Sequence, residues 1–212
     1  MLDRDDAAAD GSGDAGADPA VDGASDDDLE SGFTSGFDDA DDDGERIVLE
    51  HPNGWAAYDT VERFLEIDGW FPTPIDGTTA YKCGFNGESA KFRVIAHVNV
   101  ELEQLYLYVI ADVNVPEETR DVVSEFVCRS NYGMRIGNFE IDVTDGEIRY
   151  KSSLDFEGEV LTHQLIRNAI YPAATTIDRY FPALMRVAFG GATAADAVAE
   201  VEGRQQPPPA ES

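Results

Sequence analysis

The sequence pattern that most closely matches a chemical site is acidic and lies near the N-terminus. An EF-hand loop binds Ca²⁺ through oxygen ligands at fixed positions of a short loop. In residues 39–50 the matching positions are filled by Asp39, Asp41, Asp43, Gly44 and Glu50. Such a loop also needs a helix on each side, yet Pro52 follows this one directly. A cation-responsive regulator is therefore one hypothesis, and a chance match within an Asp-rich tract is the alternative.

A second group of side chains is basic and lies on predicted strands. Alternation of apolar and polar residues places five basic side chains on the polar faces of two strands: Lys91, Arg93, His97, Arg149 and Lys151. If the two faces point the same way, a basic strip crosses the sheet and would suit an acidic peptide. That peptide could be the N-terminal tail of the same chain, acting as an autoinhibitor. The alternative is that these are the solvated residues that antiparallel sheets expose on one face.

Apolar side chains recur at helical spacing inside the acidic N-terminal segment. Leu29, Phe33 and Phe37 are four residues apart, so a helix would place them on one side. The functional interpretation is a docking motif that folds on a protein partner. The alternative is an inert, solubilising tail with scattered aromatic residues.

Motifs that carry catalysis are missing from the sequence. There is no GxxxxGK[ST] loop, no GxGxxG after a strand and no GxSxG turn, and the three His have no metal-ligand spacing with other ligand types. We therefore predict that the chain is not an enzyme and uses no cofactor or metal. An enzyme with a dispersed site is kept as an alternative function.

The charge divides the chain into tails and one domain. Residues 1–45 hold fifteen Asp, two Glu and one Arg, a net charge of −16, and few large apolar side chains. Such a segment cannot bury enough apolar surface to offset the entropy lost on ordering. We predict a disordered acidic tail over residues 1–45, a folded domain over 46–201 and a second disordered tail over 202–212, where Gln and Pro are frequent.

The remaining residues carry a net charge of −12, which argues against two classes of partner. Nucleic acids and anionic membranes both attract clustered Lys and Arg, so we expect neither as a partner. No signal sequence and no long apolar run occur, which favours a cytoplasmic location. The acidic excess is also compatible with a halophilic source. The only two cysteines, Cys83 and Cys128, are expected as reduced thiols packed among apolar side chains.

The periodicity predicts a mixed fold. Helices are expected over 55–67, 116–131 and 161–189, the last kinked or divided by Pro172 and Pro182, with a short further helix over 192–201. Strands are expected over 79–85, 91–100, 104–112, 139–143 and 147–154, with hairpin turns at Asn86-Gly87 and Asp145-Gly146. The order α-β-β-β-α-β-β-α predicts an α+β fold, an antiparallel sheet of about five strands with helices packed on one face.

Several short motifs together resemble the YbjN family. They are Asp68-Gly69-Trp70, Pro116-Glu117-Glu118, Asn131-Tyr132-Gly133, Gly137-Asn138-Phe139-Glu140-Ile141-Asp142 and Asp145-Gly146-Glu147-Ile148-Arg149-Tyr150. The resemblance covers roughly residues 52–190. That family is described as bacterial sensory-transduction regulators and is similar in fold to the chaperones of type III secretion systems. The resemblance implies a protein-binding regulator or chaperone-like adaptor and, because such chaperones are usually dimers, a homodimer. It supplies no catalytic residues.

Overall fold

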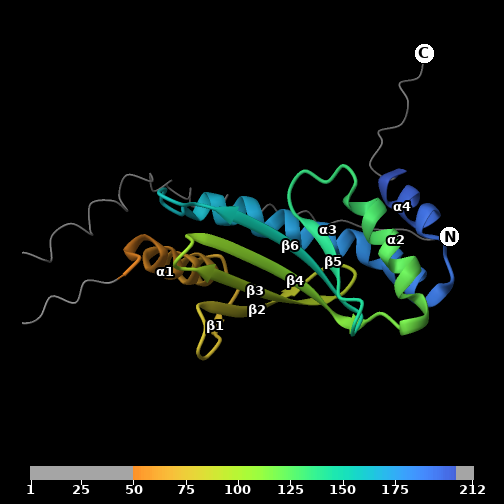
Figure 1. Cartoon of the computed structure of the whole chain (residues 1–212), viewed down its shortest axis with the longest axis horizontal. Helices are drawn as coiled ribbons and strands as arrows, with labels where there is room; N and C mark the ends of the chain where they lie inside the picture. The colour runs from red at the N-terminus through yellow and green to blue at the C-terminus, as the bar shows by residue number, and fades with distance from the viewer. Residues whose placement is uncertain (1–49, 204–212) are drawn as a thin grey trace, which may run out of the picture. The chain divides into compact units, whose positions relative to one another are not determined.

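The computed structural model describes residues 50–203 of the chain (Figure 1). The predicted disordered tail over 1–45, the docking residues Phe33 and Phe37, and the Ca²⁺-loop pattern up to Asp43 lie outside the described residues. Within them, the elements in chain order are α1 (Pro52–Ile67), β1 (Thr73–Pro74), β2 (Ala80–Asn86), β3 (Lys91–Asn99), β4 (Gln104–Asn114), the 3-10 turn η2 (Glu117–Thr119), α2 (Arg120–Asn131), β5 (Asn138–Ile141), β6 (Glu147–Asp155), α3 (His163–Gly190) and α4 (Ala194–Gly203).

The strands form one open antiparallel sheet in the order β1-β2-β3-β4-β6-β5. The predicted α+β class is therefore confirmed, with six strands and four helices in place of the expected five and three or four. The strand that sequence reasoning missed, β1, has only two residues and contains Pro74, so it shows no periodic pattern. At the other terminus, α4 continues through Gly203, two residues into the predicted tail.

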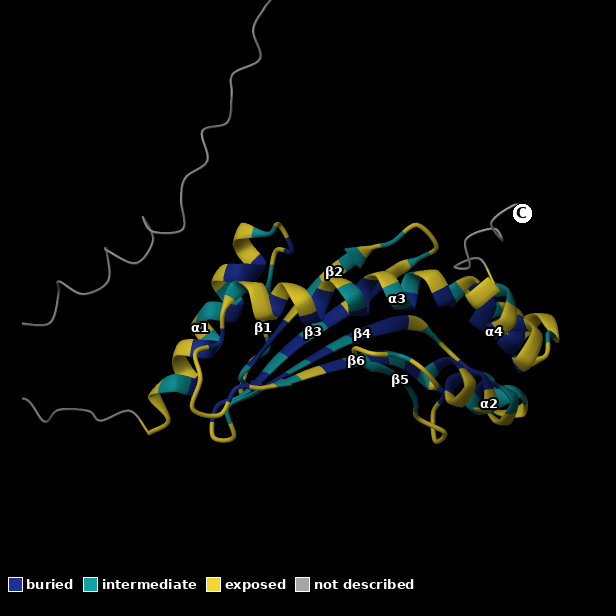
Figure 2. Ribbon diagram, turned by 90° about the horizontal axis from the view of Figure 1, so that it is seen from above, coloured by how far each residue is buried: buried dark blue, intermediate teal, exposed yellow. Residues whose placement is uncertain are grey.

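The two faces of the sheet have different environments. On β3 the even-numbered residues Phe92, Val94, Ala96 and Val98 are buried, whereas the odd-numbered residues between them are exposed or half-buried. The long helix α3 runs along the buried face, with α1 near one end of the sheet and α2 and α4 near the other (Figure 2). A fully buried large apolar side chain contributes about 1.5–3 kcal/mol, so this face supplies most of the driving force for folding. Within residues 50–203, no helix covers the opposite face (Figure 2).

Helix α3 is continuous over 28 residues, so of the two outcomes expected at its prolines, a kink or a division, the division is wrong. Thr162 caps its start by accepting a hydrogen bond from the Leu165 N–H, and Gly191 ends it in the left-handed conformation with φ of 69°. A proline removes the N–H that would bond to the carbonyl four residues earlier. For Pro182 that carbonyl belongs to Asp178, and the Ser89 hydroxyl lies 2.7 Å from it and shares its one proton between this carbonyl and the Asp178 carboxylate. A tertiary contact thus compensates part of the cost of this proline.

Helix α1 is fixed against the turn between β3 and β4. The Asn53 side-chain amide donates to the Glu103 carboxylate over 2.8 Å. At Gly54 a Cβ atom would lie 2.1 Å from the carbonyl oxygen of Val100, so only glycine allows the two backbones to approach this closely. The first turn of α1 therefore lies at the end of the sheet where β3 passes into β4.

The two cysteines differ in environment. Cys83 is half-buried on β2, and burial raises the pKa of its thiol to about 12, as expected for an inert packed thiol. Cys128 lies exposed on α2, so the prediction of a packed side chain is wrong for this residue. Both thiols are free.

Candidate functional site

The five basic side chains predicted from strand alternation all lie on the open face of the sheet. In the β3–β4 register Arg93 is opposite Ile110, and in the β4–β6 register Ile110 is opposite Arg149. Directly opposed residues share a face of a sheet. The condition set by the sequence, that the polar faces of β3 and β6 point the same way, is therefore confirmed, whereas a binding role for these residues stays a prediction.

A sixth basic residue, Lys82, joins them from β2. It is opposite Ile95, which is opposite Tyr108, which in turn is opposite Lys151, so that one row across four strands begins and ends with lysine. We call the resulting surface the basic face, made up of Lys82, Lys91, Arg93, His97, Arg149 and Lys151. Sequence reasoning missed Lys82, although its place between Tyr81 and Cys83 on β2 fits the same alternation.

The basic face contains every lysine in the protein. The chain has twelve arginines but only three lysines, at positions 82, 91 and 151. The three lie on three different strands, β2, β3 and β6, and only the tertiary structure brings them to one surface. In a chain with a formal net charge of −28, a surface of this composition is electrostatically distinct from the rest.

Two tyrosines of β4 form the floor of the basic face. The Arg149 guanidinium carbon lies 4.6 Å from the ring centroid of Tyr108, and the Lys151 ammonium lies 5.6 Å from that of Tyr106. The His97 ring is 5.9 Å from the ring of Tyr106. Cation–π contacts of this kind hold the long side chains down against the sheet. The face therefore offers flat aromatic area as well as positive charge.

Carboxylates neutralise one half of the basic face. Glu140 on β5 lies 2.7 Å from the Arg149 Nε and 3.7 Å from the Lys151 Nζ. A further carboxylate, Glu147, lies 3.6 Å from Arg149. On the other half, Arg93 is 4.0 Å from Asp112 in a largely exposed pair. Lys82 and Lys91 have no carboxylate of residues 50–203 within ion-pair distance, so the uncompensated charge is concentrated on β2 and β3.

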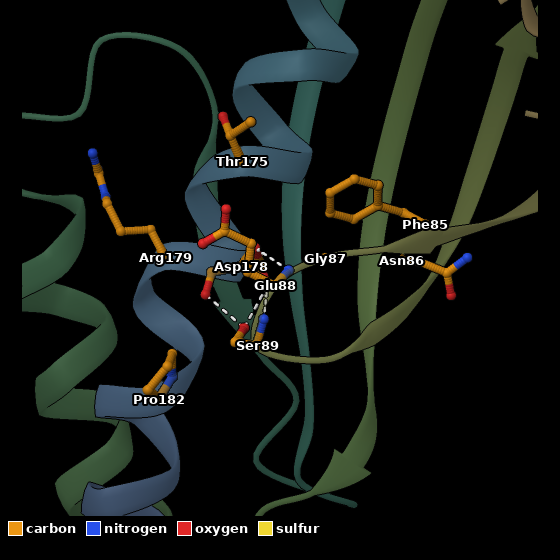
Figure 3. Close-up of a pocket in the computed structure, with 9 residues that line it drawn as sticks. All are labelled: Phe85, Asn86, Gly87, Glu88, Ser89, Thr175, Asp178, Arg179 and Pro182. Carbon is orange, nitrogen blue, oxygen red and sulfur yellow. Dashed lines mark hydrogen bonds between the residues drawn. The ribbon is translucent and has the colours of Figure 1, made fainter. Parts of the chain in front are cut away.

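The hairpin that carries Lys82 and Lys91 is held by Asp178 of α3 (Figure 3). The Asp178 carboxylate accepts hydrogen bonds from the backbone N–H groups of Glu88 and Ser89, each over 2.8 Å. The hairpin turn is centred on these two residues, because the Gly87 N–H bonds to the Ala90 carbonyl. The turn thus forms two residues later than the Asn86-Gly87 turn predicted from sequence. The Asp178 contacts fix the β2–β3 end of the basic face to the helix beneath the sheet.

The contacts with the hairpin lower the pKa of the Asp178 carboxyl. Partial burial raises the pKa of its carboxyl, but hydrogen bonds from the Ser89 hydroxyl and from the backbone N–H groups of Ser89 and Glu88 outweigh burial, and the pKa is below its usual 3.8. A carboxylate engaged by several donors is a poor proton acceptor. The geometry therefore assigns Asp178 to fixing the hairpin and gives no sign of a catalytic acid or base at this position.

Other kinds of site find no support in the part of the chain that the structure describes. No three His, Cys, Asp or Glu side chains within residues 50–203 are grouped so that they could hold a metal ion. No helix in the same range has the length and apolar composition needed to cross a membrane. Most of the Ca²⁺-loop pattern, from Asp39 to Gly44, falls outside this range and stays a prediction.

Comparisons with known proteins place the chain in a family. The model of the YbjN family, described as "Putative bacterial sensory transduction regulator", matches residues 57–186, more than half of the chain. A crystal structure of YbjN from E. coli, described as a "putative transcription regulator", is similar with a TM-score of 0.46 and 11% sequence identity, over 74% of this chain and 96% of that one. No curated protein matches the sequence. The match of the family model, over the same stretch that forms the sheet and α3, shows that this chain belongs to the YbjN family.

Proposed function

We propose that this protein is a non-enzymatic regulator that acts by binding an acidic segment of a protein partner on its basic face. The observation that carries the proposal is the collection of all three lysines, with Arg93 and Arg149, on one uncovered face of the sheet. The description of the family as regulators is in keeping with a binding role. A homodimer, expected from the resemblance to secretion chaperones, stays a prediction.

Charge complementarity determines the kind of partner. An acidic protein repels most other acidic proteins, so an acidic segment gains specificity by meeting the one surface where the local charge is positive. Lys82 and Lys91, which lack carboxylate neighbours among the described residues, offer that charge with little competition from the chain itself. The proposal therefore favours contacts at the β2–β3 half of the face.

The rings of Tyr106 and Tyr108 add an apolar contact surface for the partner, beside the charges of the basic face. Tyr106 and Tyr108 are half-buried and present ring area between the basic side chains. Tyrosine and arginine are enriched among the residues that contribute most to binding at protein interfaces. A partner segment with both carboxylates and apolar side chains fits such a surface better than a purely acidic one.

The proposal is tested by charge reversal in the full chain. The variant Lys82→Glu/Arg93→Glu changes two cations of the basic face, and the matched variant Arg63→Glu/Arg135→Glu changes two exposed cations away from it. Cross-linked partners are captured from native cells at native salt with each protein and identified by mass spectrometry. We expect the same protein partner with the wild type and the matched variant, and its loss with the face variant.

Two results would contradict the proposed function. One is a partner captured equally well by the face variant and the wild type, with both shown by circular dichroism to be folded. The other is a dominant partner that is a nucleic acid or a small molecule, which the proposed surface chemistry does not predict.

A further inference from the structure

The basic face must be occupied by solvent or by another part of the chain when no partner is bound. This inference rests on the proposed function in taking the basic face as the binding surface. We propose that the acidic N-terminal segment of the same chain, residues 1–45, binds the basic face and competes with the partner for it. The interaction surface is thus regulated by a segment that the protein carries with it.

The charges of the two parts are complementary. Residues 1–45 carry a net charge of −16, more than half of the −28 of the whole chain. The basic face carries five permanent cations and His97 against three neighbouring carboxylates, Glu140, Glu147 and Asp112. Each ion pair made at an exposed surface is weak, but many carboxylates held near one cationic surface act together.

The segment joins the domain at the end of the sheet that carries His97. Pro52 begins α1, and the first turn of α1 lies against residues 100–103, the turn between β3 and β4. His97 is two residues before the end of β3 at this same turn. Lys91, at the far end of β3, is about 20 Å further along the strand at the usual spacing of 3.3 Å per residue.

The length of the segment is more than sufficient for this distance. A flexible chain of 45 residues has a root-mean-square end-to-end distance of about 35–40 Å. A tether of this kind keeps its binding segment near the domain at an effective concentration on the order of millimolar. Even a weak affinity in the high micromolar range would therefore keep the face largely occupied.

The segment also carries apolar side chains that the aromatic floor can accept. Leu29, Phe33 and Phe37 are spaced four apart, with aspartates at 26–28 before them and at 38–39 after them. On the basic face, Ile95 lies in the lysine row between Lys82 and Tyr108. Because Glu140 and Glu147 repel carboxylates at the β6 side, the acidic residues should gather near Lys82 and Lys91 and only secondarily near Lys151.

Zero-length cross-linking with a carbodiimide tests this contact in the full chain. The reagent joins a carboxylate to an amine in contact with it, and the three lysines of the basic face and the N-terminal amine are the only amines in the sequence. The ion pair between Lys151 and Glu140, with 3.7 Å between Nζ and Oε1, is a built-in positive control for the reaction. Mixing ¹⁴N- and ¹⁵N-labelled protein separates links within one chain from links between two.

The expected result is specific. Peptides from residues 1–45 should be joined to Lys82 and Lys91 within single chains, in higher yield than to Lys151, and the yield should fall at least several-fold as salt is raised from 50 mM to 1 M, where screening lengths shorten to about 3 Å. The proposal is overturned if the Lys151–Glu140 link forms while no link joins residues 1–45 to the basic face. Links that form only between copies overturn the assignment to the same chain.

A binding measurement separates this proposal from the proposed function. A labelled peptide of residues 26–45 is titrated into the wild type and into a full-length variant in which five aspartates are replaced by Asn: Asp38, Asp39, Asp41, Asp42 and Asp43. With the net charge of its own segment reduced from −16 to −11 and the five aspartates next to the domain removed, the variant should bind the peptide at least 10-fold more tightly, and Lys82→Glu/Lys91→Glu added to it should abolish binding. Equal affinity of wild type and Asn variant overturns self-occupation, and the partner capture above still decides the proposed function.

Discussion

The hydroxyl of Ser89 lies 2.7 Å from the backbone carbonyl oxygen of Asp178, a residue 89 positions later in the chain, and bonds to it. Pro182 lacks the N–H that would otherwise bond to this carbonyl within α3. The helix therefore exposes an acceptor where the β2–β3 hairpin presents a donor. The side chain of Asp178 then bonds to the backbone of the same turn, so one residue of α3 positions the strands that carry Lys82 and Lys91.

Replacing Asp178 by Asn should destabilise the fold. The amide can accept one of the two backbone hydrogen bonds, but its NH₂ group faces a donor, so we expect the free energy of unfolding to fall by about 1–2 kcal/mol. Glu66→Gln, at an exposed position of α1, is the control and should change stability by less than about 0.5 kcal/mol. Urea unfolding followed by tryptophan fluorescence measures both. Equal stability of the two variants would show that the Asp178 contacts contribute little.

The same substitution should alter the dependence of stability on acid. The pKa of the Asp178 carboxyl is lower in the folded protein than its usual 3.8, so its ionised form stabilises the fold above that pH, and the stabilisation is lost as the pH falls through the folded value. The difference in unfolding free energy between wild type and Asp178→Asn should therefore be constant from neutral pH to about pH 5 and shrink below about pH 4. A difference that grows on acidification would mean that the sign is wrong.

Gly87 and Gly84 form a matched pair on the same hairpin. A Cβ at Gly87 would lie 2.2 Å from the Asp178 Oδ1, whereas a Cβ at Gly84 would have no atom within 4 Å. Gly87→Ala should therefore push the carboxylate off the turn and cost about 1–3 kcal/mol, while Gly84→Ala should be neutral or slightly stabilising. Thermal unfolding compares them. Similar losses in both variants would point to a general effect of Ala in the hairpin and against the contact.

β5 is an edge strand of the sheet, and the side chain of Asn131 bonds to its backbone as a neighbouring strand would. The Asn131 side-chain amide accepts from the Phe139 N–H over 2.8 Å and donates to the Phe139 carbonyl over 3.0 Å. Asn131→Ala should cost about 1–3 kcal/mol, because the Phe139 N–H loses its partner and the Phe139 carbonyl keeps only the hydrogen bond from the Asn138 side-chain amide, at 3.2 Å. The bare edge should also favour pairing between copies, seen as concentration-dependent sedimentation. Asn168→Ala, on the exposed side of α3, is the control.

Ser130 is a buried polar residue whose side chain, unlike that of Asn131, makes no hydrogen bond within residues 50–203. Its side chain is 1% exposed, and the hydroxyl has no hydrogen-bond partner among residues 50–203. Burying an unpaired hydroxyl is unfavourable, so Ser130→Ala should leave stability unchanged or raise it by up to about 1 kcal/mol. Differential scanning calorimetry measures the change. A loss above about 1 kcal/mol would mean that the hydroxyl has a partner after all.

The sequence by itself determined most of the elements and, for β3 and β6, the side of the strand that faces the core. Alternation in these two strands placed Lys91, Arg93 and Arg149 on solvent-facing sides, and the observed bounds of each strand differ from the expected ones by one residue. These features depend on neighbours in the chain, which is why a pattern can reveal them. The short motifs likewise sufficed to indicate the YbjN family, which the family model confirms over residues 57–186.

Only the tertiary structure decided which strands lie side by side and how they are aligned. Lys82, Lys91 and Lys151 share a face because β2, β3, β4 and β6 pair in one register, and that register is fixed by contacts between residues far apart in the chain. Ser89 of the hairpin turn bonds to the Asp178 carbonyl, which the N–H missing at Pro182 would otherwise bond within α3. Local patterns predicted a turn at Asn86-Gly87 and a kinked or divided helix because they contain no record of that distant partner.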